Sequence, residues 1–380
     1  MASATPSARK MESLDLVPGS SAKVQVIDTG ARITLPVANF MTPPLPGHTH
    51  AHVPSFSFLI EQPSSGRKLL FDLGVRKHLQ ALPPAVQNLI REPGWSFDVP
   101  KSVAEILREY GLDIDGGAIE AVVWSHWHFD HTGDVGQFPP STTLVTGAGL
   151  RSEFFPPYPE NQHSPLIASD FEGREHRELE FDAHSSLRIG GLAAIDYFGD
   201  GSFYLVNTPG HAVGHICGLA RVTSKNEGDA EDTFVYMGGD TAHHGGEFRP
   251  SEYLPMPKHI CPSPYPTAFP SSCPGHIFEA IHRTKEGGKS FYEISKAASH
   301  NHEDAVHSNE RMQALDAAHN VLVIIAHDST FLDEAVGLKF FPRGSIRDWK
   351  AIGSAEKARW MFLKDFIPAV EHSARYQTNI

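Results

Sequence analysis

The feature that most constrains this chain is a run of metal-binding side chains directly after an apolar stretch. The segment AIEAVVW, residues 118–124, has the apolar, β-branched character of a buried strand and leads straight into SHWHFDHTGD, residues 125–134. The second segment carries good metal ligands within six residues, namely His126, His128, Asp130 and His131. Two ions need more ligands than these, so distant segments must fold back to complete the site.

The spacing within this motif indicates how its ligands divide. Residues two apart in an extended chain face the same side, so His126 and His128 can bind one ion. Asp130 and His131 break the alternation and can address a second ion as the chain turns. Because the chain has 23 histidines, a histidine-rich surface loop is the alternative interpretation. The position after a strand and the included carboxylate argue against that alternative.

A second histidine cluster lacks these additional features. The sequence HTHAH places His48, His50 and His52 in strict alternation after PPLPG. It contains no carboxylate and begins no evident turn into a helix. We therefore expect adventitious metal binding there, or a loop near the mouth of a site.

Three later strand ends offer the missing ligands. NTPGHAVGH places His211 after a Pro-Gly turn with His215 four residues on, TFVYMGGD ends in Asp240, and VLVIIAHD reaches His327. Polar residues at the ends of buried strands are where rigid scaffolds usually carry a site. Each residue has another interpretation by itself, as a hydrogen-bonded histidine, a helix cap or a core histidine, but the combination with the first motif makes those interpretations weaker.

Composition limits the classes of function. A formal net charge of −13 disfavours nucleic acid as a partner, because an acidic surface repels phosphates. Three cysteines without a C-x-x-C pair predict no disulfide scaffold and no thiolate zinc site. We find no signal peptide and no apolar run of about 18 to 20 residues, so we expect no membrane partner and a cytoplasmic protein.

The pattern of elements predicts an α/β (α+β) fold with packed layers. Residues 1–20 are small and polar and predict a flexible tail, and residues 21–380 predict a single domain. Runs typical of strands precede and follow a mostly helical stretch at 76–117, and helices are expected near the end, at 302–319 and 354–372. A proline-rich insert at about 245–300 is too long for an ordinary connection and predicts a lid.

The aromatic side chains of this insert leave two interpretations open. They could line a small apolar pocket, or they could pack against the rest of the domain. These residues are Tyr253, Tyr265, Phe269 and Phe278.

Together these segments resemble the metallo-β-lactamase superfamily. The matches are SHWHFDH, TPGHAVGH, GGD at 238–240, AHD at 326–328 and FDLG at 71–74, in the order of the family and over roughly residues 55–330. The resemblance implies an αββα sandwich of two mixed sheets flanked by helices, with the metals at one edge.

The resemblance also assigns ligands. It implies that His126, His128 and His211 hold one metal, that Asp130, His131 and His327 hold a second, and that Asp240 bridges them. His215 has no ligand role in the family and is expected to support the site or to pack. Imidazole and carboxylate ligands suit zinc, so we expect two Zn²⁺ ions per chain, with iron or manganese as alternatives.

Two zinc ions that share a water lower its pKa towards about 7, and the resulting hydroxide attacks a carbonyl that a metal polarises. No serine nucleophile is then needed, and no G-x-S-x-G motif is present. The GGKS run at 287–290 is not a phosphate-binding loop, because Arg283 stands where the motif needs its first glycine.

Within the superfamily the chain looks most like lactonases that open acyl-homoserine lactones and like fungal relatives that act on lactams or thioesters. Those lactonases carry a tyrosine three residues after the bridging aspartate, where this chain has His243 followed by His244. We expect one of these histidines to donate a hydrogen bond to the substrate. The candidate catalytic residues are Asp130, His243 and His244.

The predicted function is the opening of a small cyclic ester or cyclic amide by a metal-bound hydroxide. One alternative is a thioesterase of glyoxalase II or polyketide-release type, and another is a mononuclear iron enzyme resembling persulfide dioxygenases. Flavodiiron relatives carry Glu at the place of His128, which disfavours that branch. The expected partner is a small-molecule substrate, and a homodimer is compatible with the sequence.

Overall fold

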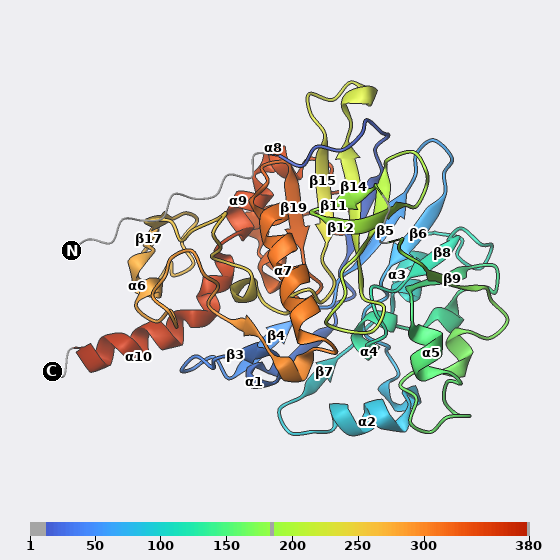
Figure 1. Ribbon diagram of the computed structural model, residues 1–380, viewed down its shortest axis with the longest axis horizontal. Helices are drawn as coiled ribbons and strands as arrows, with labels where there is room; N and C mark the ends of the chain where they lie inside the picture. Colours follow the sequence, from blue (N-terminus) through green and yellow to red (C-terminus); the bar gives the residue numbers. More distant parts are fainter. Residues whose placement is uncertain (1–12, 183–185, 378–380) are drawn as a thin grey trace.

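The computed structural model describes residues 13–182 and 186–377, and two six-stranded sheets form its centre (Figure 1). The first sheet contains, in spatial order, β1 (Lys23–Ile27), β5 (Ser57–Glu61), β6 (Lys68–Phe71), β8 (Ala121–Val123), β9 (Thr143–Gly147) and β10 (His176–Leu179). The second contains β11 (Arg188–Ile189), β12 (Leu192–Asp196), β13 (Phe203–Asn207), β14 (Ile216–Thr223), β15 (Thr233–Met237) and β19 (Val321–Ile324).

Both sheets are mixed, and their strand directions bring several strand ends to one edge. In the first sheet β6, β8, β9 and β10 pair in parallel, whereas β1, β5 and β6 are antiparallel. In the second sheet β13, β14 and β15 alternate in direction and β15 is parallel to β19. The strands β13, β15 and β19 therefore end at the same edge, which is where the later motifs begin.

Alternating side chains divide the sheets between an inner and an outer core. In β5, Phe58 and Ile60 pack in the core that also contains Phe203 and Leu205 of the second sheet, whereas Leu59 packs in a separate outer core. This alternation follows from the two-residue period of a strand.

Helices cover both outer faces of the sandwich. The helix α3 (Val103–Glu109) packs on the first sheet, and α7 (His302–Ala317) places Met312 and Leu315 against the second. Each helix begins at a polar cap, Ser102 in a capping box with Glu105, and Asn301, which accepts two backbone N–H groups. The αββα sandwich predicted from the sequence is confirmed.

A further layer packs beside the sandwich. The small sheet of β2 (Arg32–Pro36), β4 (His50–Val53) and β7 (Ser96–Asp98) shares a hydrophobic cluster with residues of the proline-rich insert and of the C-terminal segment. The insert itself contains short elements: η5 (Gly245–Glu247), β16 (His259–Ile260), β17 (Cys273–Pro274), α6 (His276–Glu279) and β18 (Glu293–Ile294).

The structure distinguishes the two interpretations of the insert aromatics. Phe278 is fully buried in this cluster, and Tyr265 and Phe269 pack against it. These three side chains therefore pack against the domain and do not line either of the two cavities described below. That the insert acts as a lid stays a prediction.

The prediction of a flexible tail over 1–20 is wrong for its described part, because residues 13–20 pack on the second sheet. Leu14 is buried, its N–H donates to Asn320 Oδ1 at 2.8 Å, and Asn320 Nδ2 donates back to the Leu14 carbonyl at 2.9 Å. This anchor depends on a contact with Asn320 that lies far away in the sequence, so no local pattern indicated it. Residues 1–12 of the predicted tail lie outside the described residues.

Two helical predictions also need correction. The segment 354–372 forms α9 (Ser354–Ala358), a 3₁₀ turn η9 (Met361–Phe366) and α10 (Ile367–Gln377) in place of one helix. Pro368 lacks an N–H group and is tolerated in the first turn of a helix, so α10 starts just before it. The stretch 76–117 holds α2 (Pro84–Ile90) and α3, but also the strand β7.

Within the part of the chain that the structure describes, every helix is too short or too polar to cross a bilayer.

Candidate metal centre

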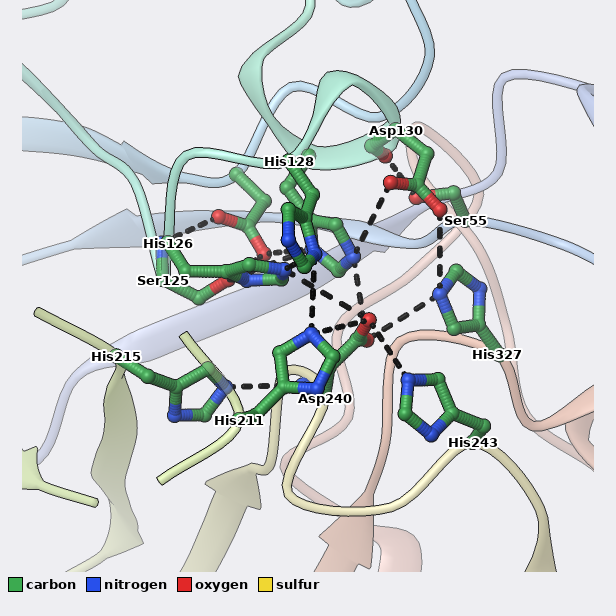
Figure 2. Close-up of polar contacts among 12 residues, drawn as sticks. Ser55, Ser125, His126, His128, Asp130, His211, His215, Asp240, His243 and His327 are labelled. Carbon is green, nitrogen blue, oxygen red and sulfur yellow. Dashed lines mark hydrogen bonds and ion pairs between the residues drawn. The ribbon is translucent and has the colours of Figure 1, made fainter. Parts of the chain in front are cut away.

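All seven ligands that the sequence analysis assigns converge at one edge of the sandwich, and Figure 2 labels each of them except His131. His126 lies in a bend directly after β8, His128 has extended backbone, and the turn α4 (Phe129–Thr132) then presents Asp130 and His131. The other ligands follow later strands: His211 follows β13, Asp240 follows β15 and His327 follows β19.

The first set of ligand atoms surrounds a common point. His128 Nδ1 lies 2.9 Å from His126 Nε2 and 3.0 Å from His211 Nε2. Asp240 Oδ2 lies 3.7 Å from His126 Nε2 and 3.5 Å from His211 Nε2. A tetrahedral zinc ion with ligands at about 2.0–2.1 Å sets its ligand atoms about 3.3 Å apart, which these separations match.

The second set uses the other oxygen of the same aspartate. Asp240 Oδ1 lies 3.1 Å from His131 Nε2 and 3.2 Å from His327 Nε2. Asp130 Oδ2 is 3.5 Å from His327 Nε2, and Asp130 Oδ1 is 4.0 Å from His131 Nε2. Asp240 therefore stands between the two sets with one oxygen facing each.

Groups behind the ligands fix their ring orientations. His131 Nδ1 lies 2.9 Å from Asp72 Oδ2, and His327 Nδ1 lies 2.8 Å from the Pro54 carbonyl. A hydrogen on each Nδ1 satisfies these acceptors and leaves Nε2 free for a ligand, the usual arrangement behind metal-binding histidines. Ser55 Oγ also donates to the Asp130 backbone carbonyl at 2.5 Å.

The protonation of the first set suits metal binding. Burial, together with repulsion from neighbouring histidines, lowers the pKa of His126 and His211 well below the ordinary value. Burial lowers the pKa of His128 to about 4. These rings are therefore neutral, which is the state that ligates a metal.

The second set compensates the charge of the shared carboxylate. Although burial lowers the pKa of His131 and His327, Asp240 raises both above the ordinary value. Although burial raises the pKa of Asp240, His131 and His327 hold it well below its usual range. Among the described residues, His131 Nε2 and Asp240 Oδ1 are buried and lie 3.1 Å apart, but neither has a hydrogen bond of normal geometry. Orphaned atoms of this kind, next to a carboxylate that serves both sets, fit a pair of divalent cations.

His215 supports the site without facing it. Its Nε2 accepts the Asp240 backbone N–H at 3.1 Å, and its Nδ1 lies 3.0 Å from the Thr208 carbonyl. The neutral ring links the loop that carries Asp240 to the end of β13. This is a supporting role, one of the two roles expected for His215.

The two candidate catalytic histidines after Asp240 lie in different surroundings. His243 Nε2 lies 3.4 Å from Asp240 Oδ2, and its ring stacks nearly parallel to His327 at 6.2 Å. His244 turns away: its Nδ1 accepts the Gly246 N–H at 3.0 Å and its Nε2 lies 3.2 Å from Asp365 Oδ2. The geometry thus brings His243, and not His244, to the metal ligands.

His244 instead lines a cleft of about 500 Å³ that also reaches the ligand His327. His48 and Asp365 complete a second group of possible ligands there. Because His244 Nδ1 accepts a backbone hydrogen, the hydrogen of the neutral ring is on Nε2 and is directed at Asp365, so this nitrogen has no lone pair for a metal. We therefore interpret the group as a hydrogen-bonded pair of His244 and Asp365 beside the buried His48, and not as a metal site.

The HTHAH segment borders this cleft. His48, His50 and His52 all contribute to its wall, and His48 Nδ1 lies 2.6 Å from the Tyr292 hydroxyl. Burial lowers the pKa of His48 to about 3. The segment therefore borders a cleft, as the second expectation has it, but His50 and His52 lie on the strand β4 and not in a loop.

A much smaller cavity lies against the ligands themselves. It has a volume of about 10 Å³, roughly that of one water molecule, and is lined by His211, Asp240 and His243. Ile294 of the insert and Ala305 of α7 close its other side.

Sequence reasoning missed several supporting residues. Asp72 belongs to the FDLG segment, but no role for it was evident there, because its position beside His131 depends on the parallel pairing of β6 and β8. Glu247 and Asp365 are acids whose partners are not evident from any motif. The left-handed backbone of Asp72, with φ of 59°, is a functional hint that only the structure reveals.

Comparison with known proteins identifies the family. A family model described as the metallo-beta-lactamase superfamily matches residues 51–222. Gamma-lactamase FDB1 of Fusarium pseudograminearum is 38% identical over 360 residues, which cover 93% of this chain and 84% of that protein. Metallo-hydrolase mfmC of Annulohypoxylon moriforme is 40% identical over 354 residues, which cover 92% of this chain and 88% of that protein.

Solved structures show the same fold at low sequence identity. A crystal structure of a quorum-quenching N-acyl homoserine lactone hydrolase aligns with a TM-score of 0.53 at 14% identity, over 86% of this chain and 99% of that one. The extent of the fungal matches, together with the matching family model, shows the family. The chain belongs to the metallo-β-lactamase superfamily and is a hydrolase of that fold.

Proposed function

We propose that the protein is a dizinc hydrolase that opens the ring of a small cyclic amide, a γ-lactam, or the corresponding cyclic ester. The observation that carries this proposal is the convergence of two ligand sets on the two oxygens of Asp240. Relatives named gamma-lactamase support the lactam: besides the Fusarium protein, Gamma-lactamase MBL2 of Gibberella moniliformis is 43% identical over 59% of this chain.

The ligand chemistry indicates what each part of the site contributes. His126, His128 and His211 would hold one ion, Asp130, His131 and His327 the other, and Asp240 both. Zinc ions bound there would lower the pKa of a shared water and polarise the substrate carbonyl. No side chain needs to act as a covalent nucleophile.

The remaining groups would bind and orient the substrate. His243 faces Asp240 from the side of the small cavity and is placed to donate a hydrogen bond to a substrate oxygen, as the tyrosine of the resembling lactonases is expected to do. The 500 Å³ cleft beside His327 is of the size that small-molecule sites have and is the candidate substrate-binding cleft.

The limited access of a substrate to the metal ligands supports the prediction that the insert is a lid. The ligand residues are buried, except for the partly buried His128, and Ile294 of the insert lines the small cavity. A ring substrate is far larger than that cavity. Movement of the segment around Ile294 would admit the substrate and exclude water afterwards.

Metal analysis and a substrate panel test the proposal together. The purified protein should contain about two zinc ions per chain, and it should hydrolyse aryl-fused γ-lactams or lactones faster than acyl thioesters. One iron per chain would favour the persulfide dioxygenase-like alternative. A preference for acyl thioesters in a zinc-loaded enzyme would favour the thioesterase.

A further inference from the structure

Glu247 is a buried carboxylate immediately behind the metal centre. Its Oε2 accepts the backbone N–H of His243 at 2.5 Å and that of His244 at 3.1 Å. The same oxygen lies 3.7 Å from His243 Nδ1. Its Oε1 is buried without a hydrogen-bond partner among residues 13–182 and 186–377.

The ring of His243 is held between this carboxylate and the shared metal ligand. Nδ1 faces Glu247, whereas Nε2 faces Asp240, and Figure 2 shows the ring directed at the Asp240 carboxylate. Phe40 packs against the ring at 4.7 Å and His211 at 4.9 Å. Because Nδ1 faces the Glu247 carboxylate, which can only accept a hydrogen, this arrangement favours the ring form that carries a hydrogen on Nδ1.

Capping alone does not account for a charged residue at this position. Glu247 forms a capping box with the turn η5, and a neutral Gln could accept the same two backbone hydrogens. Burying a carboxylate is costly unless a partner compensates its charge. The structure places an ion-pair partner, the His243 imidazole, beside Glu247 Oε2.

We propose that Glu247 is a positioning residue that holds a hydrogen on His243 Nδ1 and thereby aims Nε2 at the substrate. This inference rests on the proposed function, in which His243 contacts the substrate. In place of the phenol of the resembling lactonases, the chain would use an imidazole oriented by a buried carboxylate. A histidine oriented by an acid is a recurring arrangement in enzyme sites.

A double-mutant cycle separates positioning from capping. The variant E247Q should keep its zinc and its KM but lose about 10- to 100-fold in kcat. In an H243A background the same substitution should cost little further, because its effect passes through His243. An equal loss in both backgrounds, or full activity of E247Q, would overturn the proposal.

The matched control is E105Q. Glu105 occupies the same position of a capping box on α3, where it accepts the Ser102 N–H at 2.8 Å, but no histidine of the metal centre lies beside it. This variant should keep full activity. A loss in E105Q comparable to that in E247Q would show that cap disruption alone explains the effect, which contradicts the proposal.

Magnetic resonance of the histidine rings provides a readout that does not need turnover. In the zinc-loaded protein with nitrogen-15-labelled histidine, His243 should show a hydrogen on Nδ1, and E247Q should weaken that signal. Absence of this hydrogen in the unmodified protein rejects the inference even if E247Q does not fold. If no ring substrate is hydrolysed but the hydrogen is present and depends on Glu247, the proposed function fails while the positioning of His243 holds.

Discussion

Asp72 shows how one residue outside the ligand set can determine the metal centre. Its Oδ1 accepts the Ser125 N–H at 2.6 Å, and its Oδ2 lies 2.8 Å from Ser125 Oγ and 2.9 Å from His131 Nδ1. One carboxylate thus fixes the start of the ligand motif and one of its rings. Its φ of 59° is strained for most side chains, but Asp and Asn tolerate it.

We predict that D72N weakens the second metal site while the fold survives. Asn keeps the backbone conformation and can accept the Ser125 hydrogen, but it removes the charge behind His131. Zinc affinity at that site should fall about 10- to 100-fold, measured as zinc retained against graded chelator. The exposed control D115N should retain zinc as the unmodified protein does, and equal retention in D72N would refute the role of Asp72.

At the scale of elements, the turn after β13 depends on its glycine. Gly210 has φ of 125°, and a Cβ atom there would overlap the backbone of Asp304 and Ala305 at the start of α7. This close approach sets His211 against the other ligands. The contact at Gly210 therefore makes the position of His211 depend on the position of α7.

We predict that G210A destabilises the protein by more than about 1 kcal/mol and lowers zinc content as well. The control G228A shares a positive φ, 95°, but an added Cβ there meets open space. G228A should lose only the stability that the strained backbone costs, and it should keep its zinc. Thermal unfolding and metal analysis of both variants test this, and equal behaviour would contradict a role for the contact with α7.

The part of the site that the sequence predicts is the part that lies directly before or after recognisable strands. The strand before His126 and the spacing to His128 predict two ligands on one side, and strand ends at Asp240 and His327 predict the partners. These features can be predicted because each is either a local sequence pattern or part of a known motif.

The remaining features depend on contacts that no local pattern records. Asn320 anchors Leu14 from more than 300 residues away along the chain, and Asp365 meets His244 across 121 residues. The break near Pro368 was the exception, since proline alone could have indicated the start of α10.

At the scale of the whole molecule, histidines that are neutral in the fold couple folding to pH. Partial burial lowers the pKa of His176 to about 4, and its ring lies 2.9 Å from Thr146 Oγ1 and stacks with Phe155. A folded pKa below the unfolded value of about 6.5 means that the unfolded chain binds more protons. The associated stability is present above pH 6.5 and is lost as the pH falls towards 4.

We therefore predict that the difference in Tm between the unmodified protein and H176Q shrinks from pH 8 to pH 5. Taking the difference cancels the titration of groups that the two proteins share. Differential scanning calorimetry at several pH values measures it. A difference that stays constant or grows on acidification would show that His176 is not neutral in the fold.

The division of Asp240 between two ligand sets has a consequence for how the protein acquires its metals. An ion in either set would fix the carboxylate in the orientation that the other set needs, so the two binding events should be cooperative and each should favour the other equally. We predict a single steep zinc-uptake transition in calorimetric titration, with few singly loaded chains in native mass spectrometry. Two well-separated uptake steps would contradict this coupling. If uptake is cooperative as predicted, the activity should rise over a narrow range of zinc concentration and not gradually.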